Sequence, residues 1–290
     1  MNAKYILEKA PLVHAIIHLR FSKLPQIKED QVDFMHRALM ELGFPDYIPS
    51  RVFSLELDPS VDIKESMNVA TGRRMETRHI FRAPGQTQLV RVTETDLILK
   101  ATKYGGFEDF RDTFERVLEI LEGAVDSFTK TALKWVGLRY VDLVVPSPNS
   151  SGLAEYVKPH VLPNVLTGHN MIYTGGVSFS SAETGANQSL KLVFEEVATE
   201  GRVTKVIPDN LIETDPNAVM LIQGYPWWAN LTAKTYGIMD IDHQYAFADS
   251  PGYARDTVIK QINALHDVTS DVFWGSLTEK AENEWGKRKV

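Results

Sequence analysis

Two arginines occupy matching places in this sequence and are well suited to holding an anionic group. Arg20 and Arg139 each stand in the middle of a Leu-Arg-aromatic run. A planar guanidinium fork matches the geometry of carboxylate and phosphate groups. If the two segments lie side by side, both arginines are expected to approach one anion. The alternatives are that a neighbouring carboxylate neutralises each arginine, or that each lies on an exposed sheet face.

One histidine belongs with Arg20 in this candidate site. The run Ile16–Phe21 is rich in residues that favour an opening strand, and side chains in a strand alternate between its two faces. His14, Ile16 and His18 are therefore expected on the same face as Arg20. His18, the nearest of them, is included as a ligand- or partner-binding residue.

A cluster of large aromatic residues forms a second candidate recognition element. Tyr225, Trp227 and Trp228 surround Pro226, which should break strand pairing and leave the aromatics on a loop. Adjacent tryptophans do not easily share one direction into a core. Such side chains anchor interfaces and stack on ligands or bases. The alternative is that they seal the junction between two halves of the protein.

The densest group of metal-capable residues is the run Met-Asp-Ile-Asp-His. On a strand, Asp240 and Asp242 project from one face and His243 from the other. Two carboxylates can hold Mg²⁺, which gives the alternative function of a metal-dependent phosphoesterase or nuclease. The simpler interpretation is an exposed strand face, with Met239 and Ile241 pointing into the core.

The common enzyme signatures do not occur in the sequence. It contains no phosphate-binding Gly-x4-Gly-Lys-Ser/Thr loop, no Gly-x-Gly-x-x-Gly, no Gly-x-Ser-x-Gly and no His-Glu-x-x-His. His266-Asp267 resembles half of a metal-dependent phosphohydrolase pair, but no matching histidine cluster precedes it. These observations favour a noncatalytic binding or regulatory protein without a cofactor.

Composition narrows the class of protein further. The 290 residues are 43 % hydrophobic and 24 % charged, which is typical of a folded chain. There is no cysteine, so disulfides, thiolate metal sites and a cysteine nucleophile are excluded. The net charge of −7, with scattered basic residues, does not favour nucleic acid as a partner. No signal peptide or membrane span is evident, so a cytoplasmic protein without a membrane partner is expected, and oligomer formation stays open.

Two pairs of segments indicate an internal duplication. Residues 16–21 and 135–140 align at a shift of 119, and the Arg-Asp-Thr triplets that begin at Arg111 and Arg255 align at a shift of 144. The difference implies about 25 extra residues in the second copy, before its closing helix. We expect one unit at residues 1–133 and a second at residues 134–290.

The predicted fold class is α+β, with each unit built as strand, short helix, antiparallel sheet and long helix. The surest element is a helix from Phe107 to Phe128, because apolar residues recur in it at spacings of three and four. A short helix is expected at Asp30–Leu42 and another at Leu153–Val157. Strands are expected at Arg51–Leu57, Met75–Arg82, Gln88–Lys100, Met171–Ser181, Ser189–Thr199, Ala218–Tyr225 and Gly237–Phe247. A helix on a curved sheet, twice over, predicts a bilobed, saddle-like or helix-grip-like body.

Several short motifs carry a family resemblance. They are Lys9-Ala10-Pro11-Leu12, the run from Lys103 to Phe107, the run from Val136 to Asp142 and the run from His266 to Phe273. With them the chain resembles a sporadically distributed family of uncharacterised bacterial proteins that share a mid-chain Gly-Leu-Arg-Tyr strand. The resemblance implies a role in antiviral defence or immunity and supplies no catalytic residues. The expected partner is another protein or a small anionic ligand.

Overall fold

A computed structural model describes residues 5–55, 73–166, 172–213 and 215–289, and it shows a chain of mixed helix and strand. In these ranges nine strands form one open antiparallel sheet, and β1 (Tyr5–Leu7) pairs separately with β11 (Lys287–Lys289). The nine strands are β2 (Leu12–Phe21), β3 (Asp46–Leu55), β4 (Arg73–Arg82), β5 (Gln88–Val92), β6 (Asp96–Ala101), β7 (Leu133–Val144), β8 (Gly175–Gly185), β9 (Gln188–Ala198) and β10 (Thr235–Ala246). The helices are α1 (Glu29–Glu41), α3 (Phe107–Ala124), α4 (Arg255–Ser276) and α5 (Glu279–Glu284).

The expected combination of helices with an antiparallel sheet is confirmed. Within the described ranges, no helix is long and apolar enough to cross a membrane.

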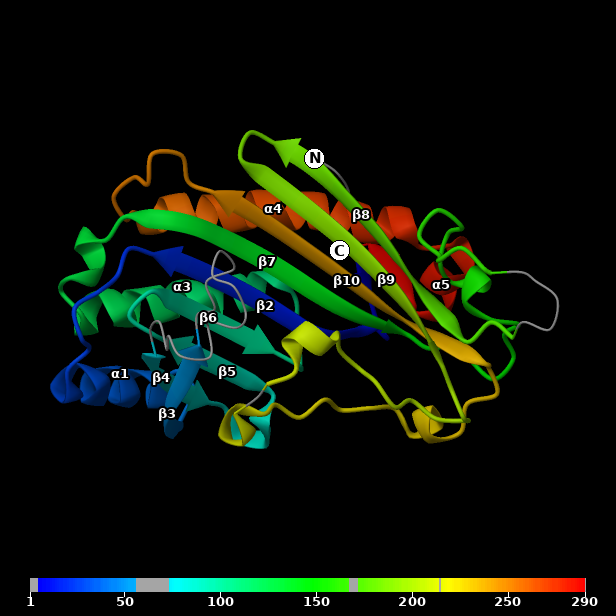
Figure 1. The fold of residues 1–290 in the computed structure, drawn as a ribbon, viewed down its shortest axis with the longest axis horizontal. Coiled ribbons are helices and arrows are strands. Elements are labelled where there is room, and N and C mark those ends of the chain that lie inside the picture. The colour runs from blue at the N-terminus through cyan, green and yellow to red at the C-terminus, as the bar shows by residue number, and fades with distance from the viewer. Residues whose placement is uncertain (1–4, 56–72, 167–171, 214, 290) are drawn as a thin grey trace, which may run out of the picture.

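The sheet separates the helices from a long irregular connection. Its strands follow the order β3-β4-β5-β6-β2-β7-β10-β9-β8. Helices α1, α3 and α4 lie behind the sheet in Figure 1, and the described parts of the β9–β10 connection, residues 199–213 and 215–234, run along the front. We call the sheet face opposite the helices the open face. Apolar residues of the connection pack on the open-face side chains of β2, β7 and β10.

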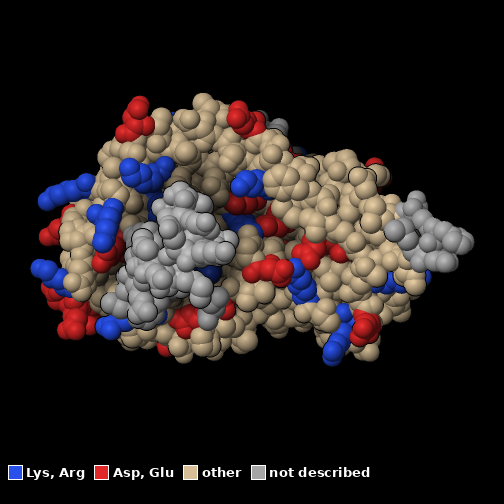
Figure 2. Space-filling model, viewed as in Figure 1, with Lys and Arg blue, Asp and Glu red and all other residues tan. Residues whose placement is uncertain are grey.

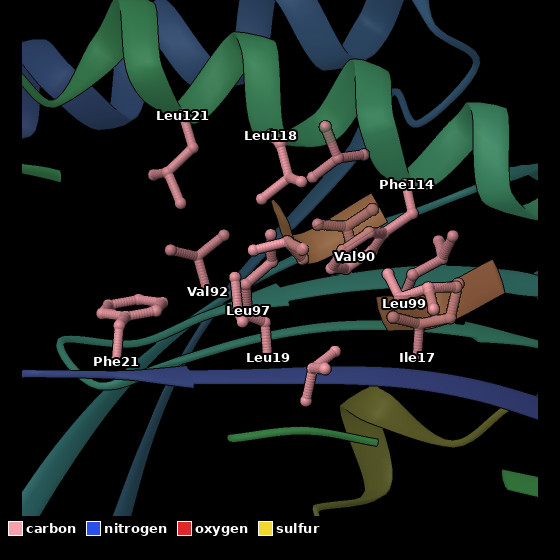
Figure 3. Packing of buried hydrophobic residues seen from close by; sticks show 14 of the residues in the cluster. Ile17, Leu19, Phe21, Val90, Val92, Leu97, Leu99, Phe114, Leu118 and Leu121 are labelled. Carbon is pink, nitrogen blue, oxygen red and sulfur yellow. The ribbon is translucent and has the colours of Figure 1, made fainter. Parts of the chain in front are cut away.

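The main core lies between the sheet and helices α3 and α4. The expected stripe of α3 points into it, and Figure 3 shows Phe114, Leu118 and Leu121 facing side chains from β2, β5 and β6. The helix itself ends at Ala124, earlier than predicted, although Phe128 is still buried at the start of a single 3₁₀ turn. The apolar spacing therefore predicted burial correctly and overestimated the length of the helix.

Three predicted elements are corrected by the structure. The expected strand Gln88–Lys100 is a hairpin of β5 and β6, because the Thr93 hydroxyl accepts hydrogen bonds from the backbone N–H groups of Thr95 and Asp96 and closes a turn. Ala218–Tyr225 is not a strand, and Leu153–Glu155 forms one 3₁₀ turn instead of an α-helix. Residues 56–57 and 171, at the ends of two expected strands, lie outside the described residues.

The order of elements is compatible with the predicted duplication. The central strand β2 is followed by β4, β5, β6 and α3, and its neighbour β7 is followed by β8, β9, β10 and α4. The first half has α1 and β3 in addition. The duplication and the bilobed shape stay predictions, to which we return below.

Truncating the centre of the α3 stripe should destabilise the protein. Leu118 has no exposed surface, so Leu118→Ala removes buried methyl groups and leaves a cavity. We expect a loss of about 2 to 5 kcal/mol in the free energy of unfolding. Arg116→Ala, on the exposed side of the same helix, is the control and should change it by less than about 0.5 kcal/mol. Chemical denaturation measures both, and a loss below about 1 kcal/mol for Leu118→Ala would contradict the assignment.

Candidate functional site

A row of five residues crosses the centre of the open face. Each residue of the row is the direct cross-strand partner of the next. In order, the row is Arg91 (β5), Ile98 (β6), His18 (β2), Gly137 (β7) and Gln244 (β10). Neighbouring strands lie about 4.8 Å apart, so the row spans roughly 19 Å. Side chains from five strands, far apart in the sequence, therefore share one surface.

A second row, two residues further along each strand, lies beside the first. It consists of Leu89, Lys100, Ile16, Arg139 and Asp242. Because side chains two apart on a strand point to the same face, both rows project away from the helices. Together the rows place basic side chains on β5, β6 and β7, and a carboxylate on β10.

A cavity of about 280 Å³ lies over these rows. Its wall is completed by Trp135 of β7 and by residues 210–213 of the β9–β10 connection. Figure 2 shows acidic and basic side chains gathered at the centre of this face. The cavity therefore combines charged groups with an aromatic ring.

The β5–β6 end of the cavity carries incompletely paired cations. The Arg91 Nε atom is buried and has no hydrogen-bond partner among the described residues. Lys100 Nζ lies 3.5 Å from a Glu213 carboxylate oxygen, and an Arg78 nitrogen lies 4.0 Å from the same carboxylate. Burial, followed by the charge of the neighbouring arginine, lowers the pKa of Arg91 and of Lys100. Both cations are thus held where a further negative charge would stabilise them.

Arg139, in contrast, is well paired. Its Nε and Nη2 atoms donate to the two Asp240 carboxylate oxygens at 2.7 and 2.6 Å, and Nη2 also donates to Asn210 Oδ1 at 3.0 Å. Arg20 is exposed, does not line the cavity and lies opposite Trp135, four residues along β7 from Arg139. That separation is about 14 Å along the strand, so the structure does not bring the two arginines to one anion.

His18 lines the cavity and lies on the same strand face as Arg20. Its Nε2 atom lies 2.7 Å from Asp96 Oδ1, and its ring contacts the Trp135 ring at a centroid distance of 4.3 Å. Burial lowers the pKa of His18, although Asp96 acts in the opposite direction. A neutral imidazole is therefore expected at neutral pH, and the cavity's positive charge comes from the arginines and Lys100.

The predicted aromatic cluster lies apart from the cavity. Trp228 is 9 % exposed and packs with Val13, Val141 and Tyr236 against the open face. Tyr225 is 44 % exposed and meets the Trp228 ring edge-on at 5.7 Å. The side chain of Trp227 lies outside the described residues. The segment is irregular, as expected, but the placement of Trp228 favours the alternative of a junction-sealing residue.

The candidate metal ligands are not gathered into one site. Asp240 is engaged by Arg139, and Asp242 accepts from the side-chain amide of Gln244 at 3.1 Å, both on the open face. His243 lies on the helix face, with Nε2 2.6 Å from the Thr184 hydroxyl oxygen. Within the described residues, no group of three or more His, Cys, Asp or Glu side chains is arranged to hold a metal ion.

Sequence reasoning missed Arg91, Lys100, Trp135 and Glu213. Arg91 and Lys100 each stand alone in an otherwise apolar strand, a signal that the single predicted strand Gln88–Lys100 obscured. Once the hairpin is recognised, Leu89 pairs with Lys100 and Arg91 with Ile98. Both basic side chains then fall on one face. Glu213 reaches them from more than a hundred residues away, which no local pattern reveals.

A buried carboxyl group lies on the other side of the same strands. Asp142 of β7 is 3 % exposed and faces the helices, near Tyr104 and Tyr140. Burial, together with the negative charge of Asp240 across the sheet, raises the pKa of Asp142 to about 8. The protonated form is therefore favoured in the folded protein at neutral pH.

The sequence matches none of the protein-family models with which it was compared, and the search of curated proteins likewise found no match.

Substitution of Trp228 should reveal a structural role. Trp228→Ala removes a buried indole from the apolar cluster beneath the connection, so the free energy of unfolding should fall by about 3 to 5 kcal/mol. Tyr225→Ala, at a more exposed aromatic of the same segment, should cost clearly less. Denaturant titration compares the two variants. Equal, small losses would favour the predicted recognition surface instead.

Asp142 should make stability depend on pH. Because its pKa is raised in the folded state, its contribution is fully present below about pH 4 and is lost as pH rises towards 8. Asp142→Asn should therefore gain stability relative to the unmodified protein between pH 4 and 8, on the order of several kcal/mol at the upper end. Asp126→Asn, an exposed control, should follow the unmodified protein. A constant difference between Asp142→Asn and the parent across this range would show that Asp142 does not titrate as described.

Proposed function

We propose that this chain is a noncatalytic binding protein that holds a small anionic ligand in the cavity of the open face. The observation that carries the proposal is Arg91, whose buried Nε atom has no hydrogen-bond partner within the described ranges. Leaving a buried charged donor unsatisfied costs stability. An anion bound beside Arg91 would accept that hydrogen bond and offset the cost.

The local balance of charge supports the same conclusion. Around Glu213 lie three cations, Arg78, Arg91 and Lys100. Of the other carboxylates that act on Arg91, Glu76 accepts from Arg78 at 2.8 Å and Asp96 is hydrogen-bonded to His18. Glu76 and Asp96 are thus already engaged, and Glu213 is shared among the three cations. The two contacts of Glu213, at 3.5 and 4.0 Å, are long for ion pairs, which leaves the cations able to bind a second carboxylate or a phosphate.

The state of the other polar groups favours binding over catalysis. The Asp240 carboxylate is engaged on both oxygens by Arg139, and Asp96 by His18 and the Thr95 hydroxyl. A general base must have a lone pair available to the proton that it removes. These carboxylates instead position Arg139 and His18, which is the arrangement of a preformed binding surface.

We also propose that the two halves are diverged copies related by a local two-fold axis through the cavity. The shift of 119 that equates Arg20 with Arg139 also equates His18 with Gly137, and these two residues are direct partners in the β2–β7 pair. Arg20 is moreover the partner of Asp96, as Arg139 is of Asp242. Such an axis would put a histidine opposite a glycine and so create a hollow at the centre. Superposition of residues 1–133 on 134–290 tests the relation, which fails if the strands or helices do not overlay.

Loss of the Arg91 guanidinium should remove anion binding. Orthophosphate is the probe, because it supplies the shared chemistry without any further group. Phosphate that binds only the folded state raises its melting temperature, and a charge-assisted hydrogen bond is worth about 1.5 to 3 kcal/mol. Arg91→Gln should therefore weaken phosphate binding by at least about tenfold in calorimetric titration.

Arg116→Gln, the same chemical change on the exposed face of α3, is the matched control and should bind phosphate like the parent. It also corrects for the general stabilisation of proteins by phosphate salts. Arg20→Gln tests the original two-arginine hypothesis and should have little effect. Equal binding by the parent and Arg91→Gln, or no phosphate binding by the parent, would overturn the proposal.

A further inference from the structure

The cavity is chemically different at its two ends. The β5–β6 end carries Arg91 and Lys100, and the β7–β10 end carries Trp135, Asp242 and Gln244. Arg139 also lines the β7–β10 end, but its guanidinium is already paired with the Asp240 carboxylate. In the first row, Arg91 and Gln244 stand at opposite ends of five adjacent strands. A ligand that fills the cavity therefore meets cations at one end and an aromatic ring with amide and carboxylate groups at the other.

From this polarity we infer that the ligand is a planar nitrogen heterocycle that carries a phosphate group, the chemistry of a nucleoside monophosphate. The inference rests on the proposed binding function and names the class of ligand. Its phosphate would lie at Arg91 and Lys100, and its ring would lie near Trp135 and Gln244.

The ring end depends on a missing side chain. At Gly137 a Cβ atom would lie 3.4 Å from an atom of the Trp135 ring and 3.4 Å from the Gln244 side chain. Trp135 and Gln244 thus lean over the position that a side chain would fill. Without a Gly137 side chain, Trp135 and Gln244 come together at this end of the cavity. An indole ring can stack on any planar base.

The polar groups at this end match the edge of a heterocycle. The Gln244 amide nitrogen donates to both Asp242 oxygens at 3.3 and 3.1 Å, which fixes the orientation of the amide. An oriented amide offers a donor and an acceptor side by side, and a carboxylate accepts from an exocyclic amino group. These are the groups that read base edges in nucleic-acid recognition.

The size of the cavity favours a small ligand. A volume of about 280 Å³ lies just below the usual range for small-molecule pockets, roughly 300 to 1,000 Å³. This volume suits one ring system with its sugar and a single phosphate better than a dinucleotide. The cations at the far end provide for one compact anionic group.

Calorimetric titration of the full chain with a graded set of ligands tests the inference. The set is orthophosphate, ribose 5-phosphate, and the 5′-monophosphates of adenosine, guanosine, cytidine and uridine. At least one nucleoside monophosphate should bind about tenfold or more tightly than ribose 5-phosphate. Arg91→Gln should weaken the binding of every phosphate compound.

Variants at the ring end separate the two ideas. Trp135→Leu and Gln244→Ala should reduce the nucleotide's advantage over ribose 5-phosphate to less than about threefold, with ribose 5-phosphate itself bound as before. Gly137→Val, which places a side chain against Trp135 and Gln244, should also reduce the nucleotide's advantage. This variant replaces Trp135→Leu if Trp135→Leu does not fold. Trp274→Leu, on α4, is the matched control and should keep the full advantage.

Each outcome identifies which idea fails. If nucleotides and ribose 5-phosphate bind equally well and both need Arg91, the heterocycle inference is wrong and the proposed anion-binding function stands. If no phosphate compound binds, the proposed function fails and the inference fails with it. A nucleotide advantage that survives both Trp135→Leu and Gln244→Ala also overturns the inference, because the ring then binds elsewhere.

Discussion

The antiparallel pairing of β2 with β7 is the constraint on which the rest of the structure depends. It joins residues more than a hundred positions apart and fixes which side chains face the helices. Ile17 and Leu138 are direct partners, and both enter one core with residues of α3 and α4. A slip of one residue would exchange the two faces of a strand and bury its charged side chains in that core. Burial of the apolar face therefore fixes the register of the open face as well.

On the open face, two arginines near the middle of the sheet differ in how their charge is paired. Arg139 forms a bidentate ion pair with the Asp240 carboxylate on the next strand. The two hydrogen bonds of this pair offset the cost of removing both charged groups from water. Arg91 receives no such partner from the described residues, and its neighbours in the row are Ile98 and Ile80. The contrast is informative because both side chains lie on the same face of the same sheet. Arg139 is completed by the protein itself, whereas Arg91 keeps a buried Nε atom that no described residue pairs.

The sequence predicted well which face of a strand each side chain occupies, but it did not predict which residues form ion pairs with one another. Period-two patterns placed His18 and Arg139 on the open face and Met239 in the core, because alternation is a local property of a strand. The hairpin at Thr93 was missed because its turn is closed by a hydroxyl and not by glycine or proline. The ion-pair partner of Arg139 is Asp240, which only the strand order places beside it. The partner of Lys100 is Glu213, which only the course of the long β9–β10 connection brings there. That connection also supplies part of the wall of the cavity.

A preformed cavity with an unsatisfied cation has a thermodynamic consequence for the whole molecule. Arg91, Lys100 and Arg78 repel one another in a partly dehydrated space, so the unliganded fold carries a cost that a hydrophobic replacement would not. The main core between the sheet and the helices lies on the opposite side and does not depend on these groups. Because only the folded state presents the three cations together, an anion that binds among them would stabilise the fold and would relieve the repulsion around Arg91.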